Sequence, residues 1–212
     1  MATNPWANVP SQPDYVLPED AAGARPFALS VLPGPWSGPA LTARVLLLLL
    51  NPGYEPGRDE RDLEELDLRI LYRSQTSGLA PFPWHLPRWA RYGGGEYWGK
   101  LLRRLTEDVG PEAVATGLAS VQWLSYHSTA WVEPAGPIPS QKYTARVIRY
   151  ALNRGALLVI ARSWPEWTAL VGEELTRAPV IHLRNHRRPY LTPGNMGTDA
   201  YGRLIAALAA SR

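Results

Sequence analysis

Four short runs of apolar residues, separated by longer amphipathic stretches, constrain the fold of this chain more than any other feature of its sequence. The runs cover residues 45–50, 119–124, 157–161 and 180–183. Strands that are apolar along their whole length are typical of parallel sheets covered on both faces. Helix-like stretches lie between and after the runs, at residues 59–72, 97–108, 141–153, 165–175 and 198–210. This alternation predicts an α/β protein, with a three-layer α/β/α arrangement and a four-stranded, mostly parallel sheet.

Proline content divides the chain into two parts. Residues 1–40 hold eight of the 21 prolines, and proline neither donates a backbone hydrogen bond nor fits a helix interior or a central strand. We therefore predict an extended N-terminal arm at residues 1–40, either wrapped over the domain through Trp6, Tyr15, Phe27 and Trp36 or partly mobile. Residues 41–212 are predicted to form a single domain, since 212 residues are few for two.

Composition argues against several classes of protein. Cysteine is absent, so no disulfide framework, thiolate nucleophile or cysteine-ligated metal site can form. The longest apolar run is far shorter than the ~20 residues of a membrane-spanning helix. The first residues also lack the basic and apolar regions of a secretory signal. We expect a cytoplasmic monomer without membrane contact, and we expect neither a cofactor nor a metal.

Basic charge is concentrated in the C-terminal third of the chain. Residues 1–140 contain 11 basic and 15 acidic side chains, whereas residues 141–212 contain 11 basic and 4 acidic ones. Nearly all the basic residues are arginines, whose planar guanidinium suits bidentate contacts with phosphate. Arg184, Arg187 and Arg188 crowd one loop and are the candidate phosphate contacts, so DNA is a possible partner. The alternative interpretation is a compositional bias towards arginine on an ordinary solvated surface.

Polar residues directly follow the apolar runs, which is where open α/β sheets bind their ligands. Asn51 follows the first run and begins a tight turn with Pro52 and Gly53. Ser125 follows the second run, and a loop rich in arginine, histidine and asparagine follows the fourth. The turn at Asn51 can equally be a turn and nothing more.

Together these segments resemble the uracil-DNA glycosylase superfamily. The resemblance rests on a strand ending in Asn51-Pro52-Gly53, a second strand with a polar end, and a late polar loop with proline, glycine and leucine. The first motif is most similar to that of the mismatch-specific uracil and thymine branch. The resemblance implies a four-stranded parallel sheet flanked by helices, catalysis without a metal, and a base flipped out of the duplex into a pocket.

The same resemblance implies catalytic roles for three residues. Asn51 would orient the attacking water, and Asn185 or His186 would stabilise the departing base anion. Such a reaction needs no pair of carboxylates, because a neutral amide can position water while donors stabilise the leaving anion. Glu55 is the acid nearest to Asn51 in the sequence, and it is either a base or a solvated turn residue.

Substrate contacts are also implied. Pro52, Gly53 and Tyr54 would shape the pocket, Phe82 would stack on the flipped base, and Leu191 would wedge into the base stack. Ser125 stands near where the family places an asparagine that reads the edge of the base, and Leu49 stands where the family has a glycine.

Other interpretations stay open. A non-catalytic protein of the same fold could bind nucleic acid or a nucleotide at the same strand ends. His127 lies between Ser125 and Ser128 in the sequence, which allows a serine–histidine hydrolase of small molecules. His182 and His186 have the spacing of metal ligands on a helix, although we expect strand and loop there. Residues 93–95, a run of three glycines, are predicted to form a flexible turn.

Overall fold

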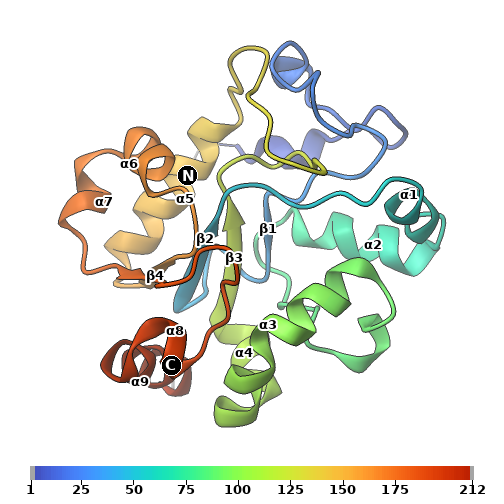
Figure 1. The fold of residues 1–212 in the computed structure, drawn as a ribbon. Helices are drawn as coiled ribbons and strands as arrows, with labels where there is room; N and C mark the ends of the chain where they lie inside the picture. The colour runs from blue at the N-terminus through green and yellow to red at the C-terminus, as the bar shows by residue number, and fades with distance from the viewer. Residues whose placement is uncertain (1–2, 211–212) are drawn as a thin grey trace.

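A computed structural model describes residues 3–210 and contains one mixed, mostly parallel β-sheet (Figure 1). Its strands are β1 (Trp36–Ser37), β2 (Val45–Leu49), β3 (Leu118–Gln122), β4 (Leu157–Ile160) and β5 (Ile181–His182). Their order across the sheet is β1-β3-β2-β4-β5. Strands β3, β2, β4 and β5 are parallel to one another, and they correspond to the four predicted apolar runs.

The prediction of four strands is wrong by one short edge strand. Strand β1 pairs antiparallel with β3 through Trp36–Val121 and Ser37–Ser120. It comes from the proline-rich segment, and Pro35 precedes it directly. Because an edge strand needs ladder hydrogen bonds on one side only, proline is tolerated next to it where a central strand would exclude it.

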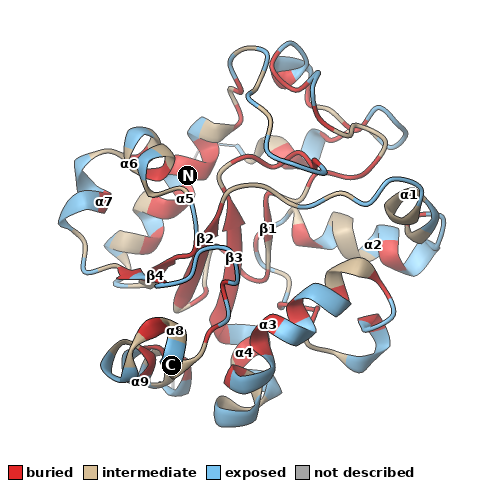
Figure 2. Ribbon diagram, in the orientation of Figure 1, coloured by how far each residue is buried: buried red, intermediate tan, exposed pale blue. Residues whose placement is uncertain are grey.

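The core residues on the two faces of the sheet belong to two separate buried clusters (Figure 2). Leu46, Leu48 and Ile160 belong to one buried cluster, whereas Val45, Leu47 and Val159 belong to the other, as the alternation of side chains along a strand requires. The first cluster contains residues from α5 (Gln141–Asn153), α6 (Trp164–Val171) and α7 (Glu173–Arg177). The second contains residues from α2 (Leu66–Gln75), α3 (Gly93–Val109), α4 (Pro111–Gly117), α8 (Pro193–Met196) and α9 (Thr198–Ala209).

The N-terminal segment, residues 3–40, is part of the first core cluster. Trp6, Tyr15, Phe27 and Trp36 are all buried, with 1–7% of their surface exposed. The segment also contains two short 3₁₀ helices, Pro5–Asn8 and Pro18–Asp20. Its backbone joins the loop after β3, because the N–H of Ala28 donates to His127 O and the N–H of Gly34 donates to Ser125 O, each at 2.9 Å. These contacts hold the segment against the end of the sheet where the candidate site lies.

The stretch 59–72 forms two helices instead of the single predicted one. Helix α1 (Arg58–Asp62) ends at Leu63, and α2 begins at Leu66. Leu63 and Leu68 are both buried, yet residues five apart point about 140° apart on one helix. A break between them lets Leu63 reach the first core cluster and Leu68 the second.

The glycine run at 93–95 is the first turn of α3, not a flexible turn before it. A β-carbon on Gly95 would lie 1.9 Å from the carbonyl oxygen of Trp89, so only glycine fits there. Trp89 ends a third 3₁₀ helix, Pro87–Trp89. The close approach of these two segments fixes the start of α3 against this 3₁₀ helix. None of the helices among residues 3–210 combines the length and apolar character that crossing a membrane requires.

Candidate functional site

The carboxyl ends of the parallel strands meet at one edge of the sheet, as the strand order requires (Figure 1). The loops after β2 and β3 run side by side beyond this edge. Backbone hydrogen bonds join Trp123 N to Leu49 O at 3.1 Å, Leu124 N to Leu50 O at 2.8 Å, and Ser128 N to Pro52 O at 3.2 Å. The turn that begins at Asn51 is therefore held in place by the end of β3.

The side-chain amide of Asn51 has a defined orientation. Its Nδ2 donates to the Ser128 hydroxyl at 2.7 Å, and it also reaches the carbonyl oxygens of Pro52 at 3.2 Å and Tyr126 at 3.4 Å. Carbonyl oxygens only accept hydrogen bonds, so the nitrogen of the amide must face them. Among residues 3–210, no group donates to Oδ1 of Asn51, and this half-buried oxygen keeps its capacity to accept a hydrogen bond.

His127 belongs to the loop after β3, between Tyr126 and Ser128, the two residues of that loop that Asn51 contacts. Its ring is 6% exposed, and Nδ1 lies 2.7 Å from the carbonyl oxygen of Gly53, to which it donates. Nε2 is buried and lacks a hydrogen-bond partner among the described residues. Burial lowers the pKa of His127, so its neutral form is favoured. Neither Ser125 nor Ser128 bonds to the ring within residues 3–210, and the serine–histidine arrangement suggested by the sequence is not formed.

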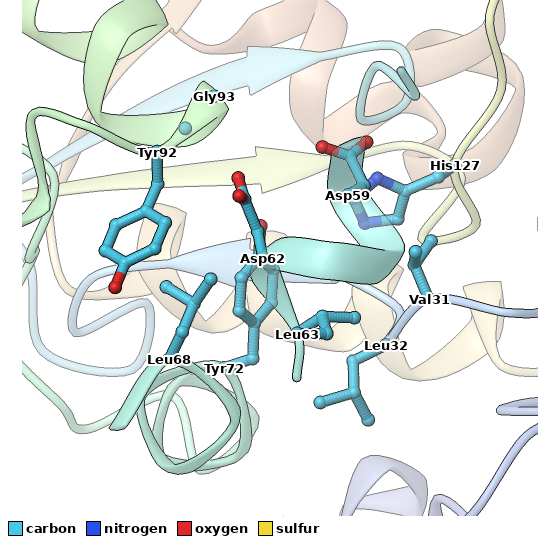
Figure 3. A pocket seen from close by; sticks show the side chains of 11 residues that line it. Val31, Leu32, Asp59, Asp62, Leu63, Leu68, Tyr72, Tyr92, Gly93 and His127 are labelled. Carbon is cyan, nitrogen blue, oxygen red and sulfur yellow. The ribbon is translucent and has the colours of Figure 1, made fainter. Parts of the chain in front are cut away.

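A small pocket opens beside the His127 ring, between α1, α2 and the start of α3 (Figure 3). Asp59 and Asp62 line it together with the rings of Tyr72 and Tyr92. Burial raises the pKa of Asp59, and the nearby His127 counteracts part of that shift. The pocket has room for about one water molecule, roughly 10 Å³, and so does not accommodate a nucleobase in this conformation.

The loop after β5, residues 183–195, is organised around Asn195. Its Oδ1 accepts from the N–H of Asn185 at 2.6 Å, and its Nδ2 donates to Arg188 O at 3.1 Å and Tyr190 O at 3.0 Å. Asn185 in turn accepts on Oδ1 from the N–H groups of Arg187 and Arg188, both at 3.1 Å. The amide of Asn185 is thereby oriented, and its Nδ2 donates no hydrogen bond within the described chain. Asn195 was missed by sequence reasoning, although an asparagine next to glycine is a turn signal.

His186 joins this loop to the end of β4. Its Nδ1 lies 2.8 Å from the carbonyl oxygen of Ala161. Arg162 follows Ala161 in the chain, and its guanidinium donates to His186 O at 2.9 Å and to Arg187 O at 3.3 Å. The side chains of Arg184, Arg187 and Arg188 are exposed on the same loop. Four arginines, Arg162, Arg184, Arg187 and Arg188, therefore lie in the loops that follow the carboxyl ends of β4 and β5.

Three large aromatic side chains that the sequence alone did not single out are exposed. Tyr190 in the late loop is 41% exposed, Tyr97 near the start of α3 is 44% exposed, and Trp131 is 38% exposed. Trp131 packs edge-on against Trp123 at the end of β3. Burial raises the pKa of Tyr97, whose ring packs edge-on against Trp98.

Several predicted substrate contacts lie elsewhere. Phe82 is fully buried, bonds through its N–H to Ala115 O in α4 at 2.8 Å, and so lies at the amino end of the sheet, away from Asn51. Leu191 is also fully buried, in the second core cluster, and Tyr190 is the neighbouring side chain that faces solvent. The exposed side chain of this loop is therefore Tyr190, and not Leu191, which the sequence suggested as a wedge.

Tyr54 and Ser125 lie near Asn51, but neither lines the pocket beside His127. The hydroxyl of Tyr54 donates to the Glu60 carboxylate, which also accepts from Ser30 at 2.8 Å. Ser125 is buried under the N-terminal segment, since its carbonyl accepts from Gly34. Asn51 follows β2 and Asn185 follows β5, two strands that are separated by β4 and therefore lie about 10 Å apart at the usual strand spacing.

We compared the chain with known proteins. No family model, curated protein or solved structure matches it. Within residues 3–210, no group of three or more histidine, cysteine, aspartate or glutamate side chains could hold a metal ion. His182 packs edge-on against Trp164, with ring centroids 4.7 Å apart, and His186 bonds to Ala161.

Proposed function

We propose that this protein hydrolyses the N-glycosidic bond of a damaged or deaminated base in DNA. The observation that carries the proposal is the fixed amide of Asn51, whose Nδ2 is held by Ser128 and two carbonyl oxygens while Oδ1 accepts no hydrogen bond within the described chain. A neutral acceptor held in one orientation suits the task of aligning a water molecule.

In the proposed reaction, a hydrogen of the water bonds to Oδ1 of Asn51, and the water oxygen attacks C1′ of the sugar. The bond between C1′ and the base nitrogen breaks, and its electron pair leaves with the base. The proton released by the water ends on solvent or on the departing base. Asn185 complements Asn51, because its Oδ1 is engaged by two N–H groups and its Nδ2 is left to donate to the base anion.

Binding of DNA in this proposal depends on the arginines of the same edge. Arg162, Arg184, Arg187 and Arg188 belong to two loops joined by hydrogen bonds, and arginine forms bidentate contacts with phosphate. We propose a monomer of three-layer α/β/α architecture that meets DNA with this edge in the cytoplasm. The basic balance of residues 141–212 supports the choice of an anionic partner.

An excision assay tests the proposal directly. Labelled oligonucleotides carrying uracil, hypoxanthine or a thymine mismatch are incubated with the protein and then treated with alkali, which breaks the strand at abasic sites. We expect breaks at the modified position with at least one substrate, and loss of those breaks in Asn51→Ala. An absence of breaks with every substrate, at protein in excess over DNA, would overturn the assignment.

A second candidate is a protein that binds nucleic acid without excision. The small size of the pocket beside His127 and the burial of Phe82 and Leu191 favour it, because this pocket has no room for a base and the predicted wedge is not exposed. Binding of the same oligonucleotides without strand breaks would support this candidate.

A further inference from the structure

The pocket beside His127 is lined by two carboxylates and by this buried ring. Asp59 and Asp62 come from one face of α1, because residues three apart on a helix are neighbours. His127 comes from the loop after β3, and Figure 3 shows the three side chains around the same pocket. Gly93 and Gly94, at the start of α3, also line it. Their N–H groups have no partner within the helix, which favours negative charge on the carboxylates nearby.

The ring nitrogen and the carboxylate oxygen that are left over in this pocket are both acceptors. Nδ1 of His127 donates to Gly53 O at 2.7 Å, so in the neutral ring Nε2 carries a lone pair and can only accept. Nε2 has no hydrogen-bond partner among residues 3–210, and only 6% of this histidine is exposed. Oδ2 of Asp59 accepts from the N–H of Glu55 at 2.8 Å, whereas its Oδ1 accepts no hydrogen bond within the described chain. A group that bonds to Nε2 and Oδ1 must therefore donate.

Negative charge in the pocket exceeds the positive charge around it. Arg58 pairs with Asp62 at 3.9 Å, but the same guanidinium also pairs with Glu55 at 3.2 Å and with Glu96 at 3.0 Å. Asp59 forms no ion pair within the part of the chain that the structure describes. Burial raises the pKa of Asp59, because ionisation of a half-buried carboxylate is costly without a cation. A cation in the pocket would offset this cost.

The size of the pocket selects among cations. It has room for about one water-sized group, roughly 10 Å³, which excludes a guanidinium or a quaternary ammonium. Residues 3–210 contain no cluster of side chains that could hold a metal ion. Hydrogen bonds of about 2.9 Å are longer than metal–oxygen bonds of roughly 2.0–2.6 Å, so a donating nitrogen reaches groups that lie too far apart to be metal ligands. A primary ammonium group has the required size, charge and donors.

We propose that this pocket binds a primary ammonium group, which donates to Nε2 of His127 and to the carboxylates of Asp59 and Asp62. The group is the ammonium ion itself or the terminal amine of a longer molecule, and Asp62, whose side chain is 23% exposed, offers the approach from solvent. Binding favours the Nδ1–H form of the ring, which holds Gly53 in the turn that begins at Asn51. The site is independent of the proposed reaction, and its test involves no base excision.

Titration with ammonium chloride at about pH 7.5, above the ordinary pKa of histidine, tests the site when nuclear magnetic resonance follows the ring nitrogens of His127. Potassium chloride and tetramethylammonium chloride at the same ionic strength are the controls, because potassium is similar in size but has no N–H, and tetramethylammonium is too large. We expect ammonium alone to shift the Nε2 signal. Diaminobutane as a second probe separates the two sources. A shift at lower concentration than with ammonium supports a longer amine, and a shift with ammonium alone supports the free ion.

Matched variants test the two carboxylates. Asp59→Asn with Asp62→Asn keeps the size of both side chains and removes their charge. It should raise the ammonium concentration at the midpoint of the titration roughly 10-fold or more, the loss expected for one charge-assisted hydrogen bond. Asp67→Asn is the control, since Asp67 is exposed on α2 and does not line the pocket, and it should leave the titration unchanged.

Three outcomes would overturn the ammonium site. Equal responses to ammonium and potassium would mean that the pocket holds water only. A proton on Nε2 at this pH would make the ring a donor, and an unchanged titration in the double variant would exclude the carboxylates. If the double variant does not fold, Asp62→Asn alone replaces it, because this side chain is partly exposed.

Discussion

The hydroxyl of Tyr126 donates a hydrogen bond of 2.8 Å to Oδ2 of Asp20, a carboxylate with no exposed surface. The same hydroxyl accepts from the N–H of Leu17 at 3.2 Å, and Oδ1 of Asp20 accepts from the N–H of Ser140 at 3.0 Å. Three segments, the N-terminal one, the loop after β3 and the start of α5, therefore meet at one buried carboxylate. A charge in such a position must be satisfied by hydrogen bonds, which explains why the N-terminal segment docks at this point.

Removal of the hydroxyl in Tyr126→Phe should destabilise the protein by about 1–3 kcal/mol, because it leaves a buried carboxylate oxygen and a backbone N–H with fewer partners. Urea denaturation at neutral pH measures the change. The exposed Tyr150→Phe is the matched control and should stay within about 0.5 kcal/mol of the wild type. Cleavage by protease within residues 3–35 should become faster in Tyr126→Phe only, and equal stability of the two variants would refute the role of this contact.

Asn51→Ala should lower single-turnover base excision about 10²–10⁴-fold while affinity for DNA stays the same, since the amide acts on water and not on phosphate. The lost hydrogen bonds to Ser128 and the carbonyl oxygens should cost about 1–2 kcal/mol of stability. Asn153→Ala, at the exposed end of α5, serves as the control. Unchanged excision by Asn51→Ala, on a substrate that the wild type processes, would show that Asn51 has no catalytic role and only forms the turn.

Replacement of Arg184, Arg187 and Arg188 by glutamine should make duplex binding less dependent on salt. If each arginine contacts one phosphate, the slope of log affinity against log salt should become less negative by roughly 2–3. Arg61, Arg69 and Arg103 are exposed on α1, α2 and α3, and their triple replacement removes the same charge elsewhere. A slope altered equally by both triple variants would mean that only net charge matters.

Stability should fall as the pH is lowered through about 6.5, the unperturbed pKa of histidine. The pKa of buried His127 is lowered in the folded state, so the unfolded chain takes up a proton that the folded chain does not. The titratable side chains that line the pocket together with His127 are Asp59, Asp62, Tyr72 and Tyr92. Asp59 has a raised pKa and acts in the opposite sense at lower pH, because its folded form takes up a proton more readily.

Comparison of wild type with His127→Gln isolates this contribution. Urea denaturation between pH 7.5 and 5.5 should show a smaller loss of stability in the variant, while His85 and His182, whose pKa values are also lowered by burial, remain in both proteins. Nuclear magnetic resonance of the ring nitrogens should report the Nδ1–H form of His127, as its bond to Gly53 O requires. A protonated ring at pH 6.5, or identical pH profiles, would contradict the assignment.

Asn195→Ala should weaken binding of DNA without changing its salt dependence. The variant keeps every arginine but loses the bonds that organise the loop from Asn185 to Tyr190, so the loop must be ordered at the moment of binding. Anisotropy titrations at several salt concentrations measure both quantities. The Asn153→Ala protein again provides the reference. A changed slope with unchanged affinity at low salt would show that Asn195 acts through charge and not through loop order.

Local pattern was enough to predict the class of fold. The four apolar runs all became parallel strands, and α5 begins and ends at the predicted residues 141 and 153. Such predictions succeed because burial on both faces leaves a strand no polar positions, and a helix repeats its apolar residues at a fixed period. The same reasoning placed Asn51 and the late loop at one edge of the sheet, since parallel strands share their carboxyl ends.

Contacts between distant segments decided the rest. Burial of both Leu63 and Leu68 split one predicted helix, and the close approach of Trp89 to Gly95 turned a predicted loop into the first turn of α3. Whether Phe82, Leu191 or Tyr190 faces solvent depends on which elements pack over each side chain. The residues next to each one in the sequence do not indicate this packing. The orientation of the Asn51 amide likewise depends on a partner far along the chain, the hydroxyl of Ser128. The sequence alone determined which residues lie at the edge of the sheet, and only tertiary packing decided which of their atoms are left to bind a ligand.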